Sequence, residues 1–282
     1  MVENAASAPP PAPPASGSAL GARIASALVM VPVALAIVWY GGPWISSLAA
    51  LSAAIMAWEW GRLVGRSTRV VDDLLLAGMA AVSVLAGAYL APWLGLLVGV
   101  AGILLLQRLA GVRNAAPIWT AAGLAWIIGP CIGFVWLRAD PTEGPATAFW
   151  LLAVVWAIDT AAYVAGKTIG GPRLAPRISP KKTWAGLIGG LLAAVLVGLA
   201  TALIIGSNQI GRIALLSGAL AIVEQIGDMA ESFAKRRFGV KDSGNLIPGH
   251  GGLLDRLDGM LAVVVAVVIL SLVTGGSVLS WR

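Results

Sequence analysis

Long apolar stretches, each close to the length of one membrane span, follow one another along most of the chain. They cover residues 23–40, 44–61, 73–90, 92–107, 117–137, 147–166, 184–205, 211–232 and 257–275. A helix needs roughly 20 apolar residues to cross a hydrocarbon layer about 30 Å thick. The pattern therefore predicts an all-α, polytopic integral membrane protein with about nine transmembrane helices.

Basic residues are distributed unevenly between the two sides of these predicted spans. Sixteen Lys and Arg fall on one side, and three (Arg138, Arg212 and Arg282) fall on the other. Because cytoplasmic loops of membrane proteins are enriched in Lys and Arg, the basic side is predicted to face the cytoplasm. This places the N-terminus in the cytoplasm and the protein in the cell inner membrane.

Composition supports a membrane protein and excludes an ordinary soluble domain. Apolar residues make up 59% of the 282 residues and charged residues only 11%, against about 25% charged residues in soluble domains. The net charge of +6 is consistent with basic loops that face anionic lipids and anionic substrates, so we expect no nucleic-acid partner. The single cysteine, Cys131, lies in an apolar run and cannot form an intrachain disulfide.

The chain divides into three predicted regions. Residues 1–20 are rich in Pro and Ala and are expected to form a disordered tail. Residues 21–145 are predicted to be N-terminal transmembrane helices. Residues 146–282 are predicted to be a C-terminal catalytic region, because they contain two long polar loops on the basic side, at 167–183 and 233–256.

Three carboxylates lie in the predicted span 211–232 or at its end, where buried acids are costly and usually functional. Glu224, Asp228 and Glu231 are spaced by four and three residues, which puts them on one face of a helix. Pairing with Lys or Arg for helix packing is one interpretation. Three acids on one stripe exceed what such a pair needs, however, and Asp228 is a natural metal ligand.

The loop after this span combines cations, glycines and acids. Its basic residues are Lys235, Arg236, Arg237, Lys241 and Arg256. Glycines let backbone amides approach an anion closely, and the loop contains Gly244, Gly249, Gly251 and Gly252. Asp255 and Asp258 would share a helical face, and such oxygen ligands suit Mg²⁺ bound with phosphate. The combination predicts a site for a nucleoside triphosphate and its metal, with a plain solvated loop as the alternative.

A second group of polar residues lies at the end of the predicted span 147–166 and in the loop after it. Asp159 and Tyr163 are four residues apart and face the same way. The loop carries hydroxyl and ammonium groups suited to phosphate, on Ser179, Lys181, Lys182 and Thr183. Anchoring of the next helix by the positive-inside rule would need only the lysines, so both interpretations stay open for this segment alone.

Two further ionisable residues, His250 and Glu59, stand apart from these groups. His250, the only histidine, is either structural or contacts a phosphate oxygen or protonates the leaving group. Glu59 lies between Trp58 and Trp60 near the predicted cytoplasmic edge of its span. We interpret Glu59 as an interfacial residue whose side chain extends toward water.

The run from Ser232 to Asp258 closely resembles the signature of bacterial phosphatidate cytidylyltransferases, also called CDP-diacylglycerol synthases. The matching residues are Ser232, Lys235, Arg236, Lys241, Asp242, Gly244, Pro248, His250, Gly251, Gly252, Asp255, Arg256 and Asp258. Residues further upstream also resemble the family, namely Asp159, Ala162, Tyr163, Gly166, residues 178–184, Gly227, Asp228 and Glu231. Two positions depart from it, since Ala185 and Ala234 stand where Glu and a larger apolar residue are usual.

The resemblance implies an all-helical nucleotidyltransferase of phospholipid biosynthesis that converts CTP and phosphatidic acid into CDP-diacylglycerol and pyrophosphate. It also implies Mg²⁺ or another divalent cation, with metal ligands at Asp228 and Asp255, and it is compatible with a homodimer. Under this hypothesis the catalytic residues are Asp228, Asp255, Asp258, Lys241, His250 and Arg256. The substrate-binding residues are Asp159, Tyr163, Ser179, Lys181, Lys182, Thr183, Ser232, Lys235, Arg236, Gly251 and Gly252.

Three other functions compete with this hypothesis. A CDP-alcohol phosphotransferase would need a different acid-rich signature, which we do not find in this sequence. A CTP-dependent polyprenol kinase would transfer the terminal phosphate and release CDP in place of pyrophosphate. A transporter would use Asp159, Glu224 and Asp228 as an ion path, but it predicts internal repeats and acids at several membrane depths, and neither is evident.

Overall fold

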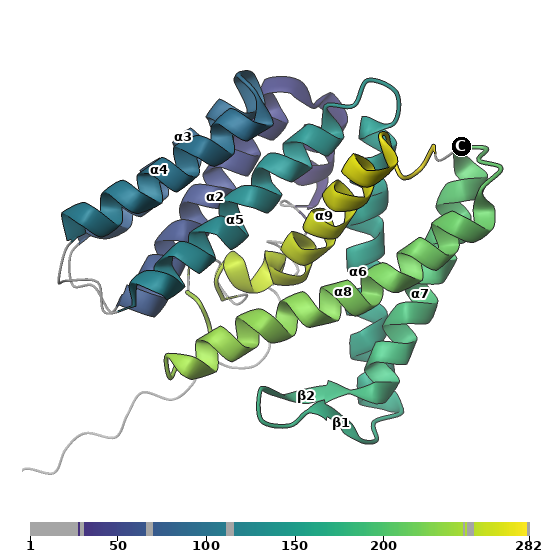
Figure 1. Ribbon diagram of the computed structural model, residues 1–282. Helices are drawn as coiled ribbons and strands as arrows, with labels where there is room; N and C mark the ends of the chain where they lie inside the picture. Colours follow the sequence, from purple (N-terminus) through teal and green to yellow (C-terminus); the bar gives the residue numbers. More distant parts are fainter. Residues whose placement is uncertain are drawn as a thin grey trace, which may run out of the picture.

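The computed structural model describes residues 28, 31–65, 70–110, 116–244, 246 and 251–280, so the predicted tail 1–20 and His250 lie outside the described residues. The described chain is largely helical (Figure 1). A first helix spans Val31–Tyr40. The others are α2 (Gly42–Gly65), α3 (Val70–Tyr89), α4 (Pro92–Ala110), α5 (Pro117–Arg138), α6 (Gly144–Thr168), α7 (Trp184–Ile204), α8 (Ile210–Arg237) and α9 (Leu254–Thr274).

Six of the described helices are long and apolar enough to cross a membrane, namely α3, α5, α6, α7, α8 and α9. The helix Val31–Tyr40 and the segment Pro92–Arg108 of α4 are apolar but shorter. These helices confirm the expected polytopic helical membrane protein. The number of about nine spans and the cytoplasmic N-terminus stay predictions.

The structure changes the bounds of both polar loops. Helix α8 continues to Arg237 and α9 begins at Leu254, so the second loop is shorter than the predicted range 233–256. The first loop contains the strands β1 (Arg173–Ala175) and β2 (Ser179–Thr183), which pair antiparallel with Ala175 opposite Ser179. The all-α prediction therefore needs one correction, a small β-hairpin on the side of the site.

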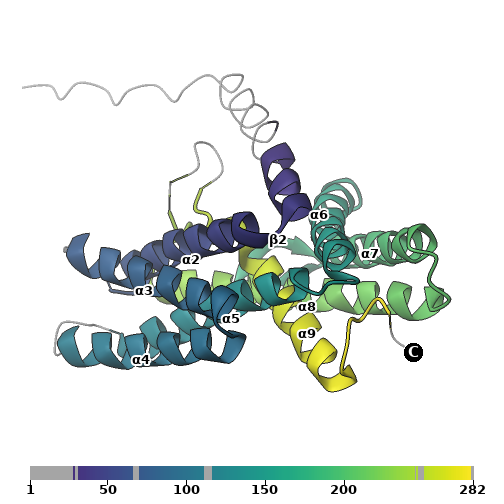
Figure 2. The ribbon, with the colours of Figure 1, turned by 90° about the horizontal axis from the view of Figure 1, so that it is seen from above.

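Helix α9 lies between two groups of helices. In Figures 1 and 2, α2 to α5 pack together on one side, and α6, α7 and α8 lie on the other. One buried apolar cluster joins α2, α3 and α5 to Leu254 and Leu261 of α9. A second joins α6, α7 and α8 to Val263 and Val267 of the same helix. Because α9 belongs to both clusters, it holds the two halves of the molecule together.

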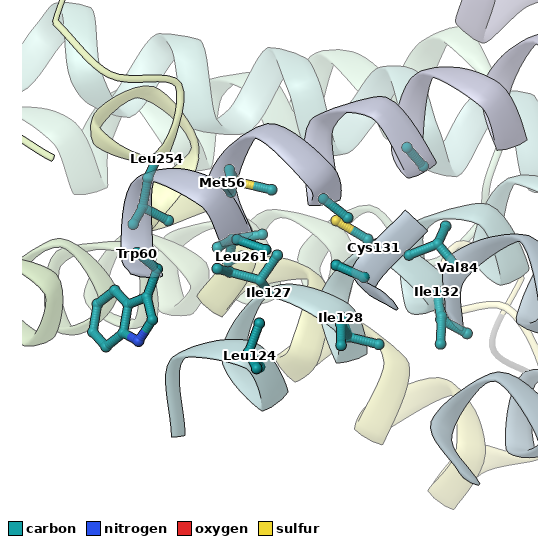
Figure 3. Close-up of a cluster of buried hydrophobic side chains, with 14 of the residues drawn as sticks. Met56, Trp60, Val84, Leu124, Ile127, Ile128, Cys131, Ile132, Leu254 and Leu261 are labelled. Atoms are coloured by element: carbon teal, nitrogen blue, oxygen red, sulfur yellow. The ribbon is translucent and has the colours of Figure 1, made fainter. Parts of the chain in front are cut away.

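The beginning of α9 is fixed by apolar contacts to α2. Figure 3 shows Leu254 beside Met56 and Trp60, and all three side chains belong to the first buried cluster. Leu254 and Met56 are completely buried. Burying each such side chain stabilises a fold by about 1.5–3 kcal/mol, so the first turn of α9 has a well-defined position against α2.

Candidate active site

Helices α8 and α9 approach closely where their acidic residues lie. A Cβ atom added at Gly227 of α8 would lie 2.5 Å from the Cβ of Ala262 and 3.1 Å from the carbonyl oxygen of Asp258. A Cβ added at Gly259 of α9 would lie 2.7 Å from the side chain of Glu224. Only glycine allows this packing, and the packing places the carboxylate of Asp258 close to that of Asp228.

Asp228 connects α8 to the hairpin. Its carboxylate forms an ion pair with the ammonium group of Lys182 in β2. The hydroxyl of Ser232, one helical turn further along α8, donates a hydrogen bond to Asp228 Oδ1 at 3.3 Å. A cation from the first polar loop is therefore held directly beside the carboxylates of α8 and α9.

Asp255, in the first turn of α9, is held by several donors. Lys235 of α8 donates to Asp255 Oδ1 at 2.7 Å and also lies 3.2 Å from Oε1 of Glu231. The backbone N–H groups of Ser243 and Gly252 donate to Asp255 Oδ2 at 2.9 and 3.0 Å. These bonds join Ser243 and Gly252 of the second polar loop to the first turn of α9.

Several carboxyl groups lie close together in the site. Asp159 of α6 lies within hydrogen-bonding reach of Glu224, while Asp258 lies beside Glu231. Glu231 is only 3% exposed, and its Oε2 has no hydrogen-bond partner among the described residues. Buried carboxylates need partners, because an uncompensated charge in an apolar interior is costly.

The donor set suits a divalent cation that is completed by a ligand. In the part of the chain that the structure describes, no three Asp, Glu, His or Cys side chains converge on one point as a metal site. Mg²⁺ often takes only one or two carboxylates and fills its other positions with water and substrate phosphates. Asp228 and Asp258, which lie near each other, are two carboxylates of this kind, and Asp255 lies one turn of α9 away.

An apolar cavity of about 450 Å³ opens beside Asp159 and Arg256. Five helices contribute to its wall, and Ala34, Met56, Phe134, Leu152 and Val264 are among its lining side chains. Asp159 and Arg256 are its charged residues. The cavity is therefore apolar over most of its wall and charged where Asp159 and Arg256 line it. Sequence reasoning missed it, because most of its wall comes from helices of the first half that carry no polar motif.

Comparison with known proteins assigns the chain to a family. The model of the cytidylyltransferase family matches residues 21–274. The chain belongs to the cytidylyltransferase family. Three similar proteins are each named phosphatidate cytidylyltransferase. The one from Brucella suis biovar 1 is 40% identical over 256 residues, covering 87% of this chain and 90% of its own. The one from Rickettsia bellii is 35% identical over 205 residues, covering 68% and 85%. The one from Haemophilus influenzae is 41% identical over 130 residues, covering 44% and 45%.

Several residues predicted to bind substrate have structural contacts in this cytidylyltransferase. Thr183 is buried and caps α7, since its hydroxyl accepts a hydrogen bond from the N–H of Gly186 at 3.1 Å. Arg236 donates to the carbonyl oxygens of Ile178 at 3.4 Å and Val240 at 3.3 Å. Arg236 therefore bridges the hairpin and the second polar loop.

Other predicted residues lie at the edge of the site. Ser179 and Lys181 are in β2, and Lys181 is exposed, as is Lys241 in the second loop. Tyr163 is also exposed, and its ring lies 5.6 Å from the ammonium group of Lys167. Gly251 adopts a left-handed backbone conformation with φ of 84°. The prediction for His250 falls outside the described residues.

Glu59 differs from its predicted role. Its side chain is 1% exposed and faces the beginning of α9, so the interfacial interpretation is wrong. The signal was present in the sequence as an acid within a predicted span. The partner could not be found there, because it lies 194 residues further along the chain.

Proposed function

We propose that this chain is a phosphatidate cytidylyltransferase, which converts CTP and phosphatidic acid into CDP-diacylglycerol and pyrophosphate. The observation that carries this proposal is the meeting of an apolar cavity with a site of clustered acids and cations. A lipid substrate needs the first and a nucleoside triphosphate needs the second. The names of the similar proteins support the same reaction.

The apolar cavity is the proposed position of the acyl chains of phosphatidic acid. Each CH₂ group buried there contributes about 0.8 kcal/mol to binding. Arg256, at the charged end of the cavity, is placed to bind the lipid phosphate, because a guanidinium group matches phosphate oxygens in two parallel hydrogen bonds. Asp159 lies at the same end of the cavity. Its carboxylate would repel the lipid phosphate unless a cation lies between them.

Asp228 and Asp255 are the proposed metal ligands, with Asp258 as a further ligand or an orienting group. Asp255 already accepts bonds from Lys235, Ser243 and Gly252. A carboxylate has about four lone-pair sites, and Ser243 N also lies 3.1 Å from Oδ1, so a metal ion at Asp255 would replace one of these donors. When bound, Mg²⁺ or another divalent cation would neutralise charge on phosphate oxygens.

The chemistry is a displacement at the α-phosphorus of CTP. A phosphate oxygen of phosphatidic acid forms a bond to this phosphorus, and the bond to the bridging oxygen of the β-phosphate breaks. The nucleophile is already an anion, so it needs no strong general base. The protein positions the two anions and neutralises their charge, a role we assign to Lys181, Lys182, Lys235, Arg236, Lys241 and Arg256. Ser232 orients Asp228 through its hydrogen bond.

The location of the site follows from its substrates. CTP is soluble and phosphatidic acid lies in the membrane, so a site where the hairpin meets α8 and α9 lets both reach it. We propose that the protein lies in the cell inner membrane with the hairpin and the 238–253 loop at the cytoplasmic face, where basic residues are favoured. A homodimer is compatible with this proposal.

The test is a transfer assay on purified, detergent-solubilised protein with phosphatidic acid and Mg²⁺. CTP labelled at the α-phosphate should give a chloroform-soluble labelled lipid, and EDTA should abolish it. CTP labelled at the γ-phosphate should label only pyrophosphate. A lipid labelled from the γ-phosphate would show that the protein is a kinase. If folded protein gives no labelled lipid from either CTP, it performs neither reaction on phosphatidic acid.

A further inference from the structure

Glu59 is a buried residue of α2, and its carboxylate accepts hydrogen bonds from the first backbone amides of α9. The N–H of Leu253 donates to Glu59 Oε1 at 2.9 Å, and the N–H of Leu254 donates to Oε2 at 2.8 Å. The hydroxyl of Ser243 lies 3.5 Å from Oε2. One carboxylate from α2 thus contacts the second polar loop and the start of α9 together.

These contacts supply a cap that α9 does not have in its own sequence. The residue at its N-cap is Leu253, and no side chain of the helix start caps the first turn. The first amides of a helix have no partner within the helix, and they form a positive end that favours an anion. Glu59 satisfies both requirements from a helix almost two hundred positions earlier in the sequence.

The glycines of the second loop make room for this carboxylate. A Cβ atom added at Gly244 would lie 2.8 Å from Glu59 Oε1, and one added at Gly252 would lie 2.9 Å from both carboxylate oxygens. Real Cβ atoms do not approach so closely, so a side chain at either position would displace Glu59. These two glycines, which the sequence suggested for phosphate, instead surround an anion that belongs to the chain.

The contact acts directly on the proposed metal ligands. Asp255 is the residue after Leu254, and Asp258 is one helical turn further. Asp255 in turn accepts the N–H groups of Ser243 and Gly252, two residues that also border Glu59. Glu59 is buried and its two oxygens are occupied, so it is placed to act on α9 and not on a substrate.

We propose that Glu59 is a positioning residue that fixes the first turn of α9 and thereby the carboxylates of Asp255 and Asp258. This inference rests on the proposed cytidylyl transfer for its effect on turnover. It gives the N-terminal helices a role in the reaction, because a displacement of reacting groups by about 1 Å can lower a rate about 100-fold.

The experiment compares Glu59→Gln and Glu59→Asp in the full-length protein. Gln keeps the shape but turns one acceptor oxygen into an NH₂ group that cannot accept from a backbone amide. We expect kcat to fall about 10- to 100-fold while KM for CTP changes less than about threefold, since Glu59 does not touch CTP. Asp keeps the charge with a shorter reach, so its kcat should lie between those of Gln and wild type.

Hydrogen–deuterium exchange gives a readout that does not depend on activity. In Glu59→Gln the amides of Leu253 and Leu254 should exchange faster, and peptides from α3 to α7 should be unchanged. The matched control is Glu143→Gln, in the residue that precedes α6 and has no side-chain cap bond there. Its kcat and exchange should equal those of the wild type.

Three results would overturn the inference. They are a Glu59→Gln kcat within twofold of wild type, unchanged exchange at Leu253 and Leu254, or a large rise in KM for CTP at constant kcat. If Glu59→Gln does not fold, Glu59→Asp replaces it, and either unchanged exchange at Leu253 and Leu254 or a large rise in KM for CTP at constant kcat would overturn the inference. An inactive wild type would instead refute the proposed function, and the exchange measurement would still test the contact.

Discussion

At the scale of single residues, the ion pair between Lys182 and Asp228 marks the centre of the site. Their side chains are 21% and 25% exposed, and a partly exposed pair of this kind contributes little to stability, typically under about 1 kcal/mol. Its significance is chemical. The ion pair holds the ammonium group of Lys182 where the phosphates of CTP are proposed to bind. A phosphate oxygen can then replace Asp228 as the partner of Lys182.

Replacing Lys182 by Met tests this role. The variant keeps an unbranched chain but loses the charge and its three donors. A hydrogen bond to a charged group contributes about 1.5–3 kcal/mol, so kcat/KM for CTP should fall about 10- to 100-fold while the thermal unfolding temperature stays near that of the wild type. Steady-state kinetics in detergent measure the effect. An unchanged kcat/KM would show that Lys182 does not bind the nucleotide.

At the scale of elements, the hairpin is the part that places Lys182, and Thr183 fixes where the hairpin ends. The hydroxyl of Thr183 caps α7 through the N–H of Gly186, and Arg236 of α8 bonds to the carbonyl oxygen of Ile178 in the turn. The hairpin is therefore joined at both ends to helices of the site. Its position follows from these helices.

Thr183→Ala should act on stability and not on the chemistry. Loss of an N-cap hydroxyl costs about 0.5–2 kcal/mol, so the thermal unfolding temperature should fall, while KM for CTP should change less than about twofold in the folded fraction. Thr183→Ser, which keeps the hydroxyl, is the matched control and should behave as the wild type. A large rise in KM without a change in unfolding temperature would instead place Thr183 in contact with the substrate.

The elements differ in how well the sequence predicted them. Hydropathy predicts α3, α5, α6 and α7 within about three residues at each end. It ends α8 too early, because Lys235, Arg236 and Arg237 are helical but not apolar. It misses the hairpin, because the Ser179–Thr183 strand has no alternation of apolar and polar residues. Hydropathy detects burial in lipid, and these segments are ordered by contacts with other elements.

The sequence also predicts the site only where its contacts are local. The sequence places Asp255 and Asp258 one helical turn apart, and both lie on α9. The proximity of Asp228 on α8 to Asp258 depends on how the two helices pack. The sequence predicted a substrate contact for Thr183, whose observed bond to Gly186 is local. The contacts of Glu59 depend instead on tertiary packing. The role of Glu59 requires α2 to lie against α9, which no local pattern in the sequence predicts.

At the scale of the whole molecule, the N-terminal helices contribute to the core around α9 and to the apolar cavity beside the C-terminal motif. Helix α9 packs into both buried clusters, and the apolar cavity is lined by the helix Val31–Tyr40, α2, α5, α6 and α9. The catalytic motif alone therefore provides the charged groups, but the proposed acyl-chain site needs both halves. Selectivity for the lipid is expected to depend on the first half.

Ala34→Phe tests the acyl-chain site. Ala34 lines the cavity, so a phenyl ring there should raise KM for a long-chain phosphatidic acid about tenfold, as expected for the loss of a few buried CH₂ groups. KM for CTP should not change. Ala36→Phe, on an exposed part of the same helix outside the cavity, is the matched control. Equal kinetics for the two variants would contradict the placement of the acyl chains.

The most direct test of the whole account is a comparison of wild type and Asp228→Asn in the α-labelled CTP assay. The substitution preserves the shape of the side chain and removes the charge that pairs with Lys182. The account predicts CDP-diacylglycerol and pyrophosphate in equal amounts from the wild type, and a loss of at least about 100-fold in the variant, with unchanged folding by size-exclusion chromatography. Near-normal turnover by folded Asp228→Asn would contradict the proposed site.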